Sequence, residues 1–457
     1  MNKTEILNEI RDYVQESSIT EGKIQNITTN IEDSKPEDLV FYFIRDDKKA
    51  LDLFYERLKK SNPGLVITNR EIKDVDYIHL LEIDFLKVQK QIADVFYPNK
   101  NHLKIFGVTG TNGKTTVTSL AMQISEQFGK KSFSVGTIGV MDSIGEIYPS
   151  PHATTPSYLE IRKIIHKFQD SYENMFIEVS SHALDQNRLF DLMLEEAAFV
   201  SFSLDHLDYH KTKSDYLRAK LKITKSLRSD ARLIIPSSEV ELLKQVRKEI
   251  TNKNLLRETK KIREGLPLAF LPLYNRNNLE VAVELCKKIG VCEEIDFNRL
   301  KMPKGRFEAI EEKNRIVIID YAHTPDALEN ICRATKEACP GRRLITVFGC
   351  GGDRDKTKRP LMGKAASDYS DKIIVTSDNP RSEEPAEIIK SIVMGIRGNE
   401  YIIEEDRECA IALAINESCE RDVVIIAGKG HEEYQEIKGH KKKFSDVEMA
   451  QKYLREL

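Results

Sequence analysis

The feature that most constrains this chain is a glycine-rich turn at residues 107–116, with the sequence GVTGTNGKTT. A short apolar run at 104–108 leads into the turn, and a helical pattern at 117–128 follows it. A strand, a glycine-rich turn and a helix in this order form a phosphate-binding loop, because backbone N–H groups and the helix N-terminus attract phosphate oxygens. Lys114 can reach the β- and γ-phosphates, and the Thr115 hydroxyl can ligate Mg²⁺. The turn therefore predicts a nucleotide site in an α/β domain.

One departure from the common motif leaves an alternative open. The pattern G-x-x-x-x-G-K-[ST] requires its first glycine at position 108, and this chain does not meet that requirement. A glycine-rich turn between a strand and a helix that binds no ligand would show the same flanking patterns. The loop alone therefore does not decide between a nucleotide site and a structural turn.

The composition limits the class of protein. The 457 residues predict about three domains, and 40% apolar with 31% charged residues is typical of globular proteins. The net charge of −3 favours neither nucleic acid nor an anionic membrane as a partner, and no apolar stretch is long enough to span a bilayer. The N-terminus lacks a signal-peptide core, and the seven cysteines form no C-x-x-C pair. We expect a cytoplasmic protein with reduced thiols.

Apolar patterns divide the chain into three α/β segments, 1–100, 101–302 and 303–457. The turn-rich residues 97–101 and 302–305 are the expected joints. In the second and third segments short apolar strands alternate with helical patterns, which predicts doubly wound, mostly parallel sheets covered by helices. The expected strands are 39–43, 64–68, 132–137, 175–179, 197–203, 232–235, 315–319, 344–348, 372–376 and 423–427, and the expected helices include 48–60, 214–227, 325–338, 360–369, 386–396 and 407–418.

Polar residues gather at the expected carboxyl ends of strands in the second segment, where such sheets bind ligands. Glu178 closes the strand at 175–179, and a carboxylate there suits Mg²⁺ better than it suits a protein core. His206 follows the strand at 197–203, although a lone histidine is more often an ordinary loop residue. Thr154 and Thr155 precede a proline and taken alone indicate a helix cap. Lys220 taken alone is typical of a helix surface.

Three polar loops follow successive strands of the third segment, at 349–355, 377–381 and 428–432. Each loop is rich in glycine or contains Asn-Pro, and each holds Arg, Asp or Glu. A turn or an anion-binding nest would explain any one of them. Three such loops at one edge of a sheet predict a shared polar pocket.

Taken together, these motifs resemble the Mur ligase family of bacterial cell-wall synthesis, from about residue 104 to the C-terminus. The resemblance implies three α/β domains: an N-terminal domain on the UDP-sugar side (1–100), a central ATP-binding domain (101–302) and a C-terminal amino-acid-binding domain (303–457). It also implies ATP-dependent amide formation with Mg²⁺ as cofactor, by a cytoplasmic monomer that acts on small molecules and needs no nucleic acid or membrane span. The motifs are GTNGKTT at 110–116, EVSSHAL at 178–184, DHLDYH at 205–210, DYAHTP at 320–325 and GKGHE at 428–432.

The resemblance, carried over residue by residue, implies an ATP site and a metal site. Lys114, Glu178, His206 and Lys220 would be catalytic. The last three would hold Mg²⁺ with Thr115, and Lys220 would do so as a carbamate, which replaces a cation with an oxygen anion. The residues implied to bind ATP are Gly110, Thr111, Asn112, Gly113, Lys114, Thr115, Thr116, Asn275, Asn278, Arg306 and Asp320.

The branch of the family that this chain resembles most adds the third peptide residue to UDP-N-acetylmuramoyl-L-alanyl-D-glutamate. The resemblance implies that the D-Glu γ-carboxylate attacks ATP to give an acyl phosphate, which the incoming amine then displaces. Closure about residues 302–305 would keep water from that intermediate. The residues implied to hold the UDP-sugar dipeptide are Thr154, Thr155, Ser180, Gln186 and Arg188.

The third residue is implied by DNPR at 378–381, which matches the signature of branches that take meso-diaminopimelate. The distal end of that amino acid is zwitterionic. Arg354 and Arg381 can clamp its carboxylate with forked donors, and Glu432 can pair with its ammonium. L-Lysine stays the alternative, although a lysine-adding enzyme has no use for the clamp. The full set implied to bind diaminopimelate is Arg354, Asp378, Asn379, Arg381, Gly428 and Glu432.

Two further classes of protein remain as alternatives. A related amide ligase such as a folylpolyglutamate synthetase is disfavoured by residues 178–182 and 379–381, and a nucleotide-binding paralogue without ligation is disfavoured by the intact catalytic set.

The family's N-terminal D-S-R…G-D-L pattern, which helps to hold uridine, is reduced here to Asp38-Leu39 with residues 28–30 upstream. The uridine contacts of the first segment are therefore not carried over.

Overall fold

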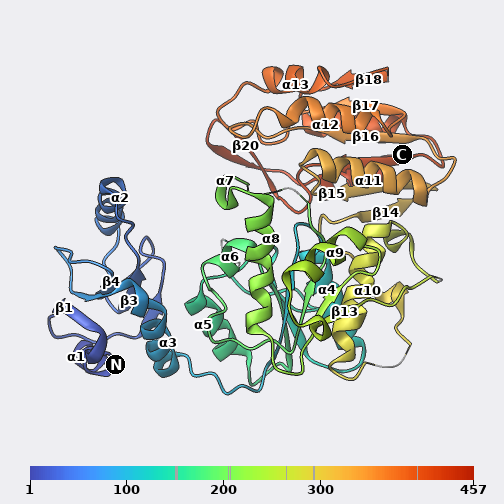
Figure 1. Ribbon diagram of the computed structural model, residues 1–457. Coiled ribbons are helices and arrows are strands. Elements are labelled where there is room, and N and C mark those ends of the chain that lie inside the picture. Colours follow the sequence, from blue (N-terminus) through green and yellow to red (C-terminus); the bar gives the residue numbers. More distant parts are fainter. Residues whose placement is uncertain (150–152, 204, 206, 264, 292–293, 399) are drawn as a thin grey trace. The chain divides into compact units, whose positions relative to one another are not determined.

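The computed structural model describes residues 1–457 except 150–152, 204, 206, 264, 292–293 and 399. These residues form three large β-sheets and a two-stranded hairpin (Figure 1). By its internal contacts the chain forms two compact units. Unit 1 comprises Met1–Lys114, Ser125–Glu258 and Leu285–Val291, and unit 2 comprises Thr115–Ile124, Thr259–Glu284 and Cys292–Leu457. The three sheets lie within the three predicted segments, whereas the boundaries at 100 and 302 stay predictions.

The first sheet of unit 1 has the strand order β1-β5-β4-β3-β2, and β1 alone of these strands runs antiparallel to its neighbour. Successive residues of β3 alternate between two cores: Leu39 and Phe41 pack on the side of α3, and Val40 packs on the side of α2. The sheet is therefore buried on both faces, as parallel sheets usually are. The bounds are β1 Val14–Ser18, β2 Asn26–Thr28, β3 Asp38–Tyr42, β4 Leu65–Thr68, β5 Tyr77–Leu80, α1 Lys3–Glu9, α2 Lys48–Leu58 and α3 Phe85–Phe96.

The second sheet of unit 1 has the order β13-β12-β11-β6-β10-β7-β8-β9. The strands from β13 to β7 are parallel, and the short β8 and β9 extend the edge in antiparallel fashion. This arrangement confirms the predicted mostly parallel sheet. The strands are β6 Lys104–Thr109, β7 Ser132–Gly136, β8 Gly139–Met141, β9 Glu146–Tyr148, β10 Asn174–Glu178, β11 Glu196–Phe199, β12 Leu233–Ile235 and β13 Leu256–Glu258, and the helices between them are α4 Lys114–Gln127, α5 Tyr158–Phe168, α6 Ser181–Asp185, α7 Leu207–His210, α8 Lys213–Leu221 and α9 Val240–Glu249.

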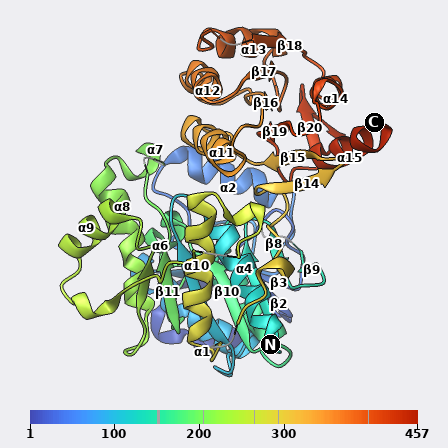
Figure 2. The same cartoon turned by 90° about the vertical axis from the view of Figure 1, so that its right-hand side faces the viewer.

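The sheet of unit 2 has the order β14-β15-β19-β16-β17-β18, with only β14 of these strands antiparallel. One face packs on α11, α12 and α13, and the other packs on α14 and α15 (Figure 2). The predicted doubly wound C-terminal fold is confirmed. The bounds are α10 Leu273–Lys287, β14 Glu308–Glu312, β15 Arg315–Asp320, α11 Pro325–Ala338, β16 Leu344–Phe348, α12 Lys358–Ser367, β17 Lys372–Val375, α13 Pro385–Val393, β18 Glu400–Ile403, α14 Arg407–Glu417, β19 Val423–Ala427, β20 Tyr434–Ile437, β21 His440–Lys443 and α15 Asp446–Glu456.

Most differences from the sequence prediction lie at sheet edges and helix ends. The short strands β1, β2, β5, β8, β9, β13, β14 and β18 and the hairpin of β20 and β21 were missed, because most of them carry no continuous apolar run. The predicted helix at 214–227 ends earlier, since α8 stops at Leu221 and Lys222–Ser226 forms a 3₁₀ turn. Within the part of the chain that the structure describes, no helix is long and apolar enough to cross a bilayer, and the six cysteines seen are free thiols.

Candidate active site

The phosphate loop lies between β6 and α4. Gly113 takes a φ of +87° directly before the helix, a left-handed conformation that favours glycine at this position. Lys114 then folds back over the loop, and its Nζ donates to the carbonyl oxygens of Gly110 and Thr111, each at 2.9 Å. The lysine ammonium is thus held at the mouth of the turn, where a phosphate-binding loop places it.

The loop that follows β11 supports the phosphate loop. The Thr111 amide donates to the Ser201 carbonyl oxygen at 2.9 Å, and the Asn112 amide donates to Ser201 Oγ at 2.9 Å. The Thr111 hydroxyl also lies 3.3 Å from the hydroxyl of Tyr216 on α8. Strand β11 and helix α8 therefore fix the shape of residues 110–112 from the side.

Lys220 is buried, so a surface lysine is the wrong interpretation. Only 1% of the residue is exposed, and its Nζ donates to the Gly110 carbonyl oxygen at 2.8 Å. The Nζ also lies 4.5 Å from the ring centre of Tyr216, one helical turn earlier on α8. Burial, and then the nearby charge of Lys114, hold the pKa of Lys220 well below its usual range. The structure thus places a lysine with a disfavoured ammonium directly against the phosphate loop.

Glu178 ends β10, which pairs directly with β6, and it lies opposite Val108. It is 1% exposed, and both carboxylate oxygens are held by Thr137: Oε1 accepts from the backbone amide at 2.9 Å and Oε2 from the hydroxyl at 3.1 Å. A Cβ at Gly136 would lie 2.0 Å from Oε1. Glycine at 136 therefore makes the room that this buried carboxylate needs.

The residues predicted to hold the dipeptide come together beside Glu178. Thr155 Oγ1 donates to the Glu178 carbonyl oxygen at 2.9 Å and accepts from the Ser180 amide at 2.9 Å. Arg188 donates to the Thr155 carbonyl oxygen and, through Nη2, to Gln186 Oε1 at 2.7 Å. The interpretation of the Thr-Thr-Pro start as a helix cap is wrong. Ser157 caps α5 instead, and Thr154 Oγ1 lies 3.3 Å from the hydroxyl oxygen of Thr137.

The motif at 205–210 is described only in part, because His206 lies outside the described residues. His210 is buried, and its Nε2 lies 2.9 Å from Ser181 Oγ. The Tyr209 hydroxyl donates to Asp185 Oδ2 at 3.0 Å. The end of the motif is thus bound to α6, and the predicted metal-binding role of His206 stays a prediction.

In unit 2, two of the predicted ATP residues lie close together. Asp320 accepts from the Phe307 and Ala322 amides at 2.7 and 2.8 Å, and burial raises the pKa of its carboxyl group. The Arg306 guanidinium lies 4.7 Å from the ring centre of Tyr321. Its positive charge favours the ionised form of Asp320, so these two residues interact.

The two predicted asparagines of α10 are both buried. Asn275 and Asn278 are 1% and 4% exposed, and Asn275 Nδ2 donates to the Ala269 carbonyl oxygen at 2.8 Å. Their role with the adenine stays a prediction.

The three C-terminal loops meet at one edge of the sheet of unit 2, as predicted. Glycines allow the approach: a Cβ at Gly349 would lie 2.3 Å from the Thr376 carbonyl oxygen, and one at Gly352 would lie 1.9 Å from that of Pro380. A Cβ at Gly428 would lie 2.6 Å from Asp378 Oδ2. No side chain fits at these contacts, so the glycines bring the loops after β16, β17 and β19 together.

The predicted amino-acid residues line this junction. Arg354 Cγ and Arg381 Nη1 both lie within reach of a Cβ built at Gly351, at 3.7 and 2.9 Å, so the two arginines flank that glycine. Arg381 Nη1 donates to the Gly352 carbonyl oxygen at 2.7 Å, while Arg354 is exposed. On the other side, Asn379 Nδ2 donates to Glu432 Oε2 at 2.8 Å. The site thus combines a pair of cations with a carboxylate.

Sequence reasoning missed several residues of this region. Lys429 is 0% exposed and lies among the residues predicted to bind the amino acid. It was not predicted to do so, although it belongs to the GKGHE motif. Arg407 forms a fully buried ion pair with Asp446, at 2.7 Å from Nε to Oδ1, and donates to the Ala427 carbonyl oxygen at 3.0 Å. The sequence predicted Thr137 only as the last residue of a strand and did not predict its contact with Glu178. Arg407 and Asp446 each begin a helix, and nothing in the sequence marks them as buried.

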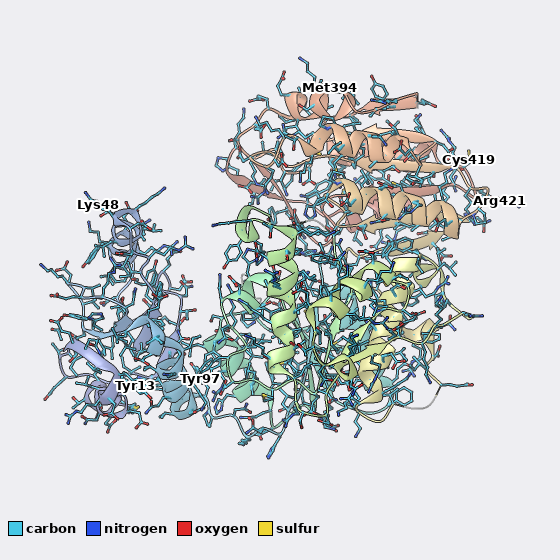
Figure 3. All side chains as sticks on the ribbon, viewed as in Figure 1. Tyr13, Lys48, Tyr97, Met394, Cys419 and Arg421 are labelled. Atoms are coloured by element: carbon cyan, nitrogen blue, oxygen red, sulfur yellow. The ribbon has the colours of Figure 1, made fainter. Side chains whose placement is uncertain are left out.

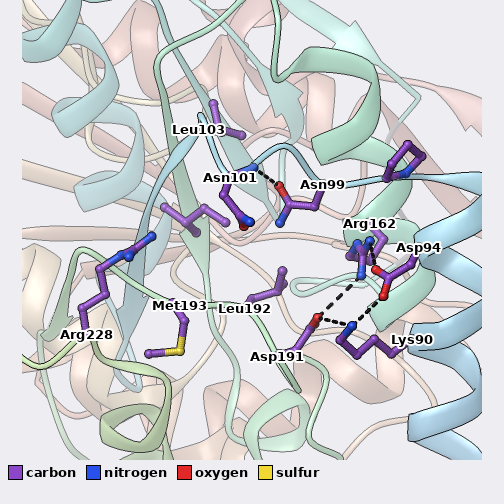
Figure 4. Close-up of a pocket in the computed structure, with 12 residues that line it drawn as sticks. Lys90, Asp94, Asn99, Asn101, Leu103, Arg162, Asp191, Leu192, Met193 and Arg228 are labelled. Atoms are coloured by element: carbon purple, nitrogen blue, oxygen red, sulfur yellow. Dashed lines mark hydrogen bonds and ion pairs between the residues drawn. The ribbon is translucent and has the colours of Figure 1, made fainter.

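Two cavities lie away from these residues. One of about 780 Å³ in unit 1 is lined by Leu103 and Ile105 near the start of β6, whereas the phosphate loop follows the other end of that strand. Lys90, Asp94, Arg162 and Asp191 in its lining pair with one another, as Arg162 does with Asp94 at 2.7 Å (Figure 4). The second is an apolar groove beside α13, where Met394 is 78% exposed (Figure 3). Neither lining contains a predicted site residue.

Known protein families match most of this chain. The family model described as Mur ligase middle domain matches residues 108–264, and the one described as Mur ligase, glutamate ligase domain matches residues 305–430. The chain is 36% identical over 456 residues to UDP-N-acetylmuramoyl-L-alanyl-D-glutamate--2,6-diaminopimelate ligase of Aquifex aeolicus (strain VF5), covering 94% of each chain. It is 37% identical over 433 residues to an enzyme of that name, numbered 1, from Clostridium acetobutylicum, covering 88% of this chain and 89% of the relative.

A solved structure of a protein with the same name matches the fold. It superposes with a TM-score of 0.63 at 27% identity and covers 95% of both chains. Sequence and fold therefore agree over nearly the whole length. The chain belongs to the Mur ligase family.

Proposed function

We propose that this chain is an ATP-dependent ligase that joins meso-diaminopimelate to UDP-N-acetylmuramoyl-L-alanyl-D-glutamate in peptidoglycan precursor synthesis. Relatives with this activity in their names align over most of the chain. The observation that carries the choice of amino acid is the junction of the three C-terminal loops, where two arginines flank Gly351 and Asn379 contacts Glu432. The three segments 1–100, 101–302 and 303–457 are proposed to serve the UDP-sugar, ATP and the amino acid, respectively.

The amino-acid preference follows from charge. The distal end of meso-diaminopimelate carries a carboxylate and an ammonium, and L-lysine has only the ammonium. Arg381 and Arg354 match the carboxylate, because a guanidinium binds it with forked donors. Glu432 matches the ammonium. Lysine offers no distal carboxylate to the arginine pair, so the proposed site favours diaminopimelate.

The reaction proceeds in two steps. The γ-carboxylate oxygen of the D-Glu residue attacks the γ-phosphorus of ATP, which expels ADP and forms an acyl phosphate. The amino group of diaminopimelate then attacks the acyl carbon, and the tetrahedral intermediate releases inorganic phosphate and a proton to leave the amide. Lys114 offsets the negative charge on the phosphates in the first step. A carboxylate is a poor acyl donor, so the phosphate supplies the leaving group that amide formation needs.

Several residues beside the phosphate loop suit a magnesium ion held together with nucleotide phosphates. Glu178 offers the hard oxygen ligands that Mg²⁺ prefers, and Mg²⁺ sites with one or two carboxylates plus phosphate oxygens are common. Among the described residues no larger cluster of carboxylates, histidines or cysteines could hold a metal ion. Bound Mg²⁺ would neutralise phosphate charge and polarise the transferred phosphoryl group. Glu178, Thr115, His206 and a carbamylated Lys220 are the proposed ligands.

Lys220 suits carbamylation because only a neutral amine adds to carbon dioxide. The structure disfavours its ammonium through burial and through Lys114, as its lowered pKa indicates. The adduct is an anion, which would turn a buried cation beside the phosphate loop into an oxygen ligand. Direct mass analysis of the intact protein prepared with and without bicarbonate tests this step.

The proposed activity is tested by phosphate release with purified protein. ATP and Mg²⁺ are supplied with the UDP-sugar dipeptide, with diaminopimelate, or with both. Release that requires both substrates supports the ligase, because each turnover then ends in an amide. Release with ATP alone would point to a hydrolase, and no release in any mixture would favour a nucleotide-binding protein without ligation.

A further inference from the structure

Lys429 enters the amino-acid junction from a sharp turn after β19. The glycines on either side of it, Gly428 and Gly430, have φ values of +118° and +53°, which side chains rarely adopt. This turn directs Lys429 inward, and its side chain is 0% exposed. A buried lysine ammonium is costly unless it is paired, so its partners indicate why it is there.

The partners of Lys429 are three residues that we assign to diaminopimelate. Its Nζ donates to Asn379 Oδ1 at 2.9 Å and to Glu432 Oε2 at 3.3 Å, and it lies 3.9 Å from Asp378 Oδ1. The described contacts of Lys429 therefore connect the loop after β17 with the loop after β19. One ammonium group therefore contacts all three side chains.

The contacts fix which way the Asn379 amide points. Its Oδ1 accepts from Lys429 Nζ and from the Glu436 backbone amide at 2.9 Å, and its Nδ2 donates to Glu432 Oε2 at 2.8 Å. A flipped amide would place its NH₂ group against an ammonium and an N–H, with its oxygen against a carboxylate. Lys429 thereby also fixes Glu432, which uses Oε2 for both contacts and keeps Oε1 for a ligand.

Lys429 and Arg407 have different carboxylate partners. Arg407 is bound by both oxygens of Asp446, with Nη2 to Oδ2 at 2.8 Å, so that pair is matched internally. Lys429 is then the one cation in direct contact with Asp378 and Glu432 among the described residues. Glu432 contacts this ammonium through Oε2, so its Oε1 can accept from the ammonium of an incoming amino acid.

We propose that Lys429 is a positioning residue for the amino-acid substrate: it holds Asn379 and Glu432 in the one arrangement that presents a carboxylate to the substrate ammonium. This inference rests on the proposed function. It assigns to Lys429 no contact with the substrate and no part in the phosphoryl transfer.

The test is steady-state kinetics of the full chain with Lys429→Met, which keeps an unbranched side chain and removes the charge. We expect the KM for diaminopimelate to rise about tenfold to 100-fold. The KM for ATP should stay within about twofold, because the ATP site does not depend on this contact. A rise in both KM values by the same factor would overturn the proposal.

A matched control separates positioning from general stability. Lys372 is also buried in unit 2, but it begins β17 at the opposite end of the sheet and pairs with Glu400 and Glu417. Lys372→Met should lower the melting temperature without changing the KM for diaminopimelate. The same KM rise in Lys372→Met and Lys429→Met would show that loss of stability, not of positioning, is responsible.

Two further variants keep the proposal testable if Lys429→Met folds poorly. Asn379→Asp retains the lysine contact but loses the N–H donated to Glu432, so the KM for diaminopimelate should rise here as well; an unchanged value would contradict the account. In a Glu432→Gln background, Lys429→Met should cost less than in the wild type, whereas additive effects would mean that the two residues act independently. If wild-type protein makes no amide, the proposed function itself fails, which is a distinct result.

Discussion

Two buried lysines lie beyond the carboxyl ends of strands in different sheets, in opposite electrostatic surroundings. Lys220 in unit 1 donates to the Gly110 carbonyl oxygen and has Lys114 as a charged neighbour. Lys429 in unit 2 donates to Asn379 and Glu432 and lies near Asp378. Burial lowers the pKa of both. Among the described residues, Lys429 has carboxylates in contact that favour its ammonium, whereas Asp205 favours that of Lys220 less than burial disfavours it. The partners of a buried lysine, more than its burial, indicate whether it serves as a reactive amine or as a fixed cation.

The largest expected effect is on turnover in the Lys220→Met variant. If Lys220 acts as a metal ligand after carbamylation, kcat should fall about 10³-fold, because charge stabilisation in phosphoryl transfer is lost. The melting temperature should stay the same or rise, since the variant removes a buried cation. Kinetics and thermal unfolding of the same preparation measure both. Activity within tenfold of the wild type would remove Lys220 from the mechanism.

The second effect is on stability and sharpens the contrast between the lysines. Lys429→Met should lower the free energy of unfolding by about 2–3 kcal/mol, because Asp378 and Glu432 lose their charged partner. Lys220→Met should not show this loss. Urea unfolding of the two variants side by side gives the comparison, and equal losses would mean that the surroundings of the two lysines do not differ as we describe.

The third effect concerns the pH dependence of stability without carbon dioxide. Because the folded pKa of Lys220 is lowered, the unfolded chain binds more protons between that pKa and the unfolded value of about 10.4. The contribution of Lys220 therefore makes stability rise with pH through this window, by up to about 1.4 kcal/mol per pH unit. Lys220→Met should flatten that rise when unfolding is followed from pH 7 to 10.

Lys372 serves as a control, because its pKa is shifted in the opposite direction from that of Lys220. Its contacts with Glu400 and Glu417 raise its pKa, so its stabilising contribution is complete below the unfolded pKa and is lost as pH rises through the folded pKa. Lys372→Met should therefore not remove the rise between pH 7 and 10. Flattening in both variants would assign the effect to something other than Lys220.

The smallest effect is on recognition of the amino acid. Arg381→Lys keeps the charge but loses the forked donor, and we expect about a tenfold rise in the KM for diaminopimelate. Turnover at saturation should change little, because Arg381 acts on the distal end of the substrate. Kinetics with diaminopimelate and with L-lysine measure the preference. An unchanged KM would exclude Arg381 from the clamp.

The fold could be predicted from the sequence where apolar periodicity is strong. The bounds of β16, β19 and α11 equal the predicted ranges 344–348, 423–427 and 325–338, because buried strands and capped helices carry clear signals. The edge strand β18 was missed, since its residues are mostly exposed. The sequence prediction of a helix cap at Thr154 or Thr155 also placed the start of α5 too early. The hydroxyl of Thr155 donates to the end of β10 and does not cap a helix.

The candidate site could be predicted only as far as motifs mark it. Glu178 and the three C-terminal loops were found because carboxylates and glycines at strand ends are unusual. The burial of Lys220 could not be read from its helix, since the packing of α8 on the phosphate loop is a long-range contact. The pairing of Thr137 with Glu178 and of Arg407 with Asp446 joins residues 41 and 39 positions apart, respectively, which no local pattern encodes.

The most direct test of the central claim is the mass of the product formed in a competition. The protein is mixed with ATP, Mg²⁺, UDP-N-acetylmuramoyl-L-alanyl-D-glutamate and equal amounts of meso-diaminopimelate and L-lysine. We predict a product whose mass corresponds to addition of diaminopimelate, with little or none of the lysine product. A product containing mainly lysine would contradict the arginine clamp, and unchanged dipeptide in the presence of bound nucleotide would contradict the ligase assignment.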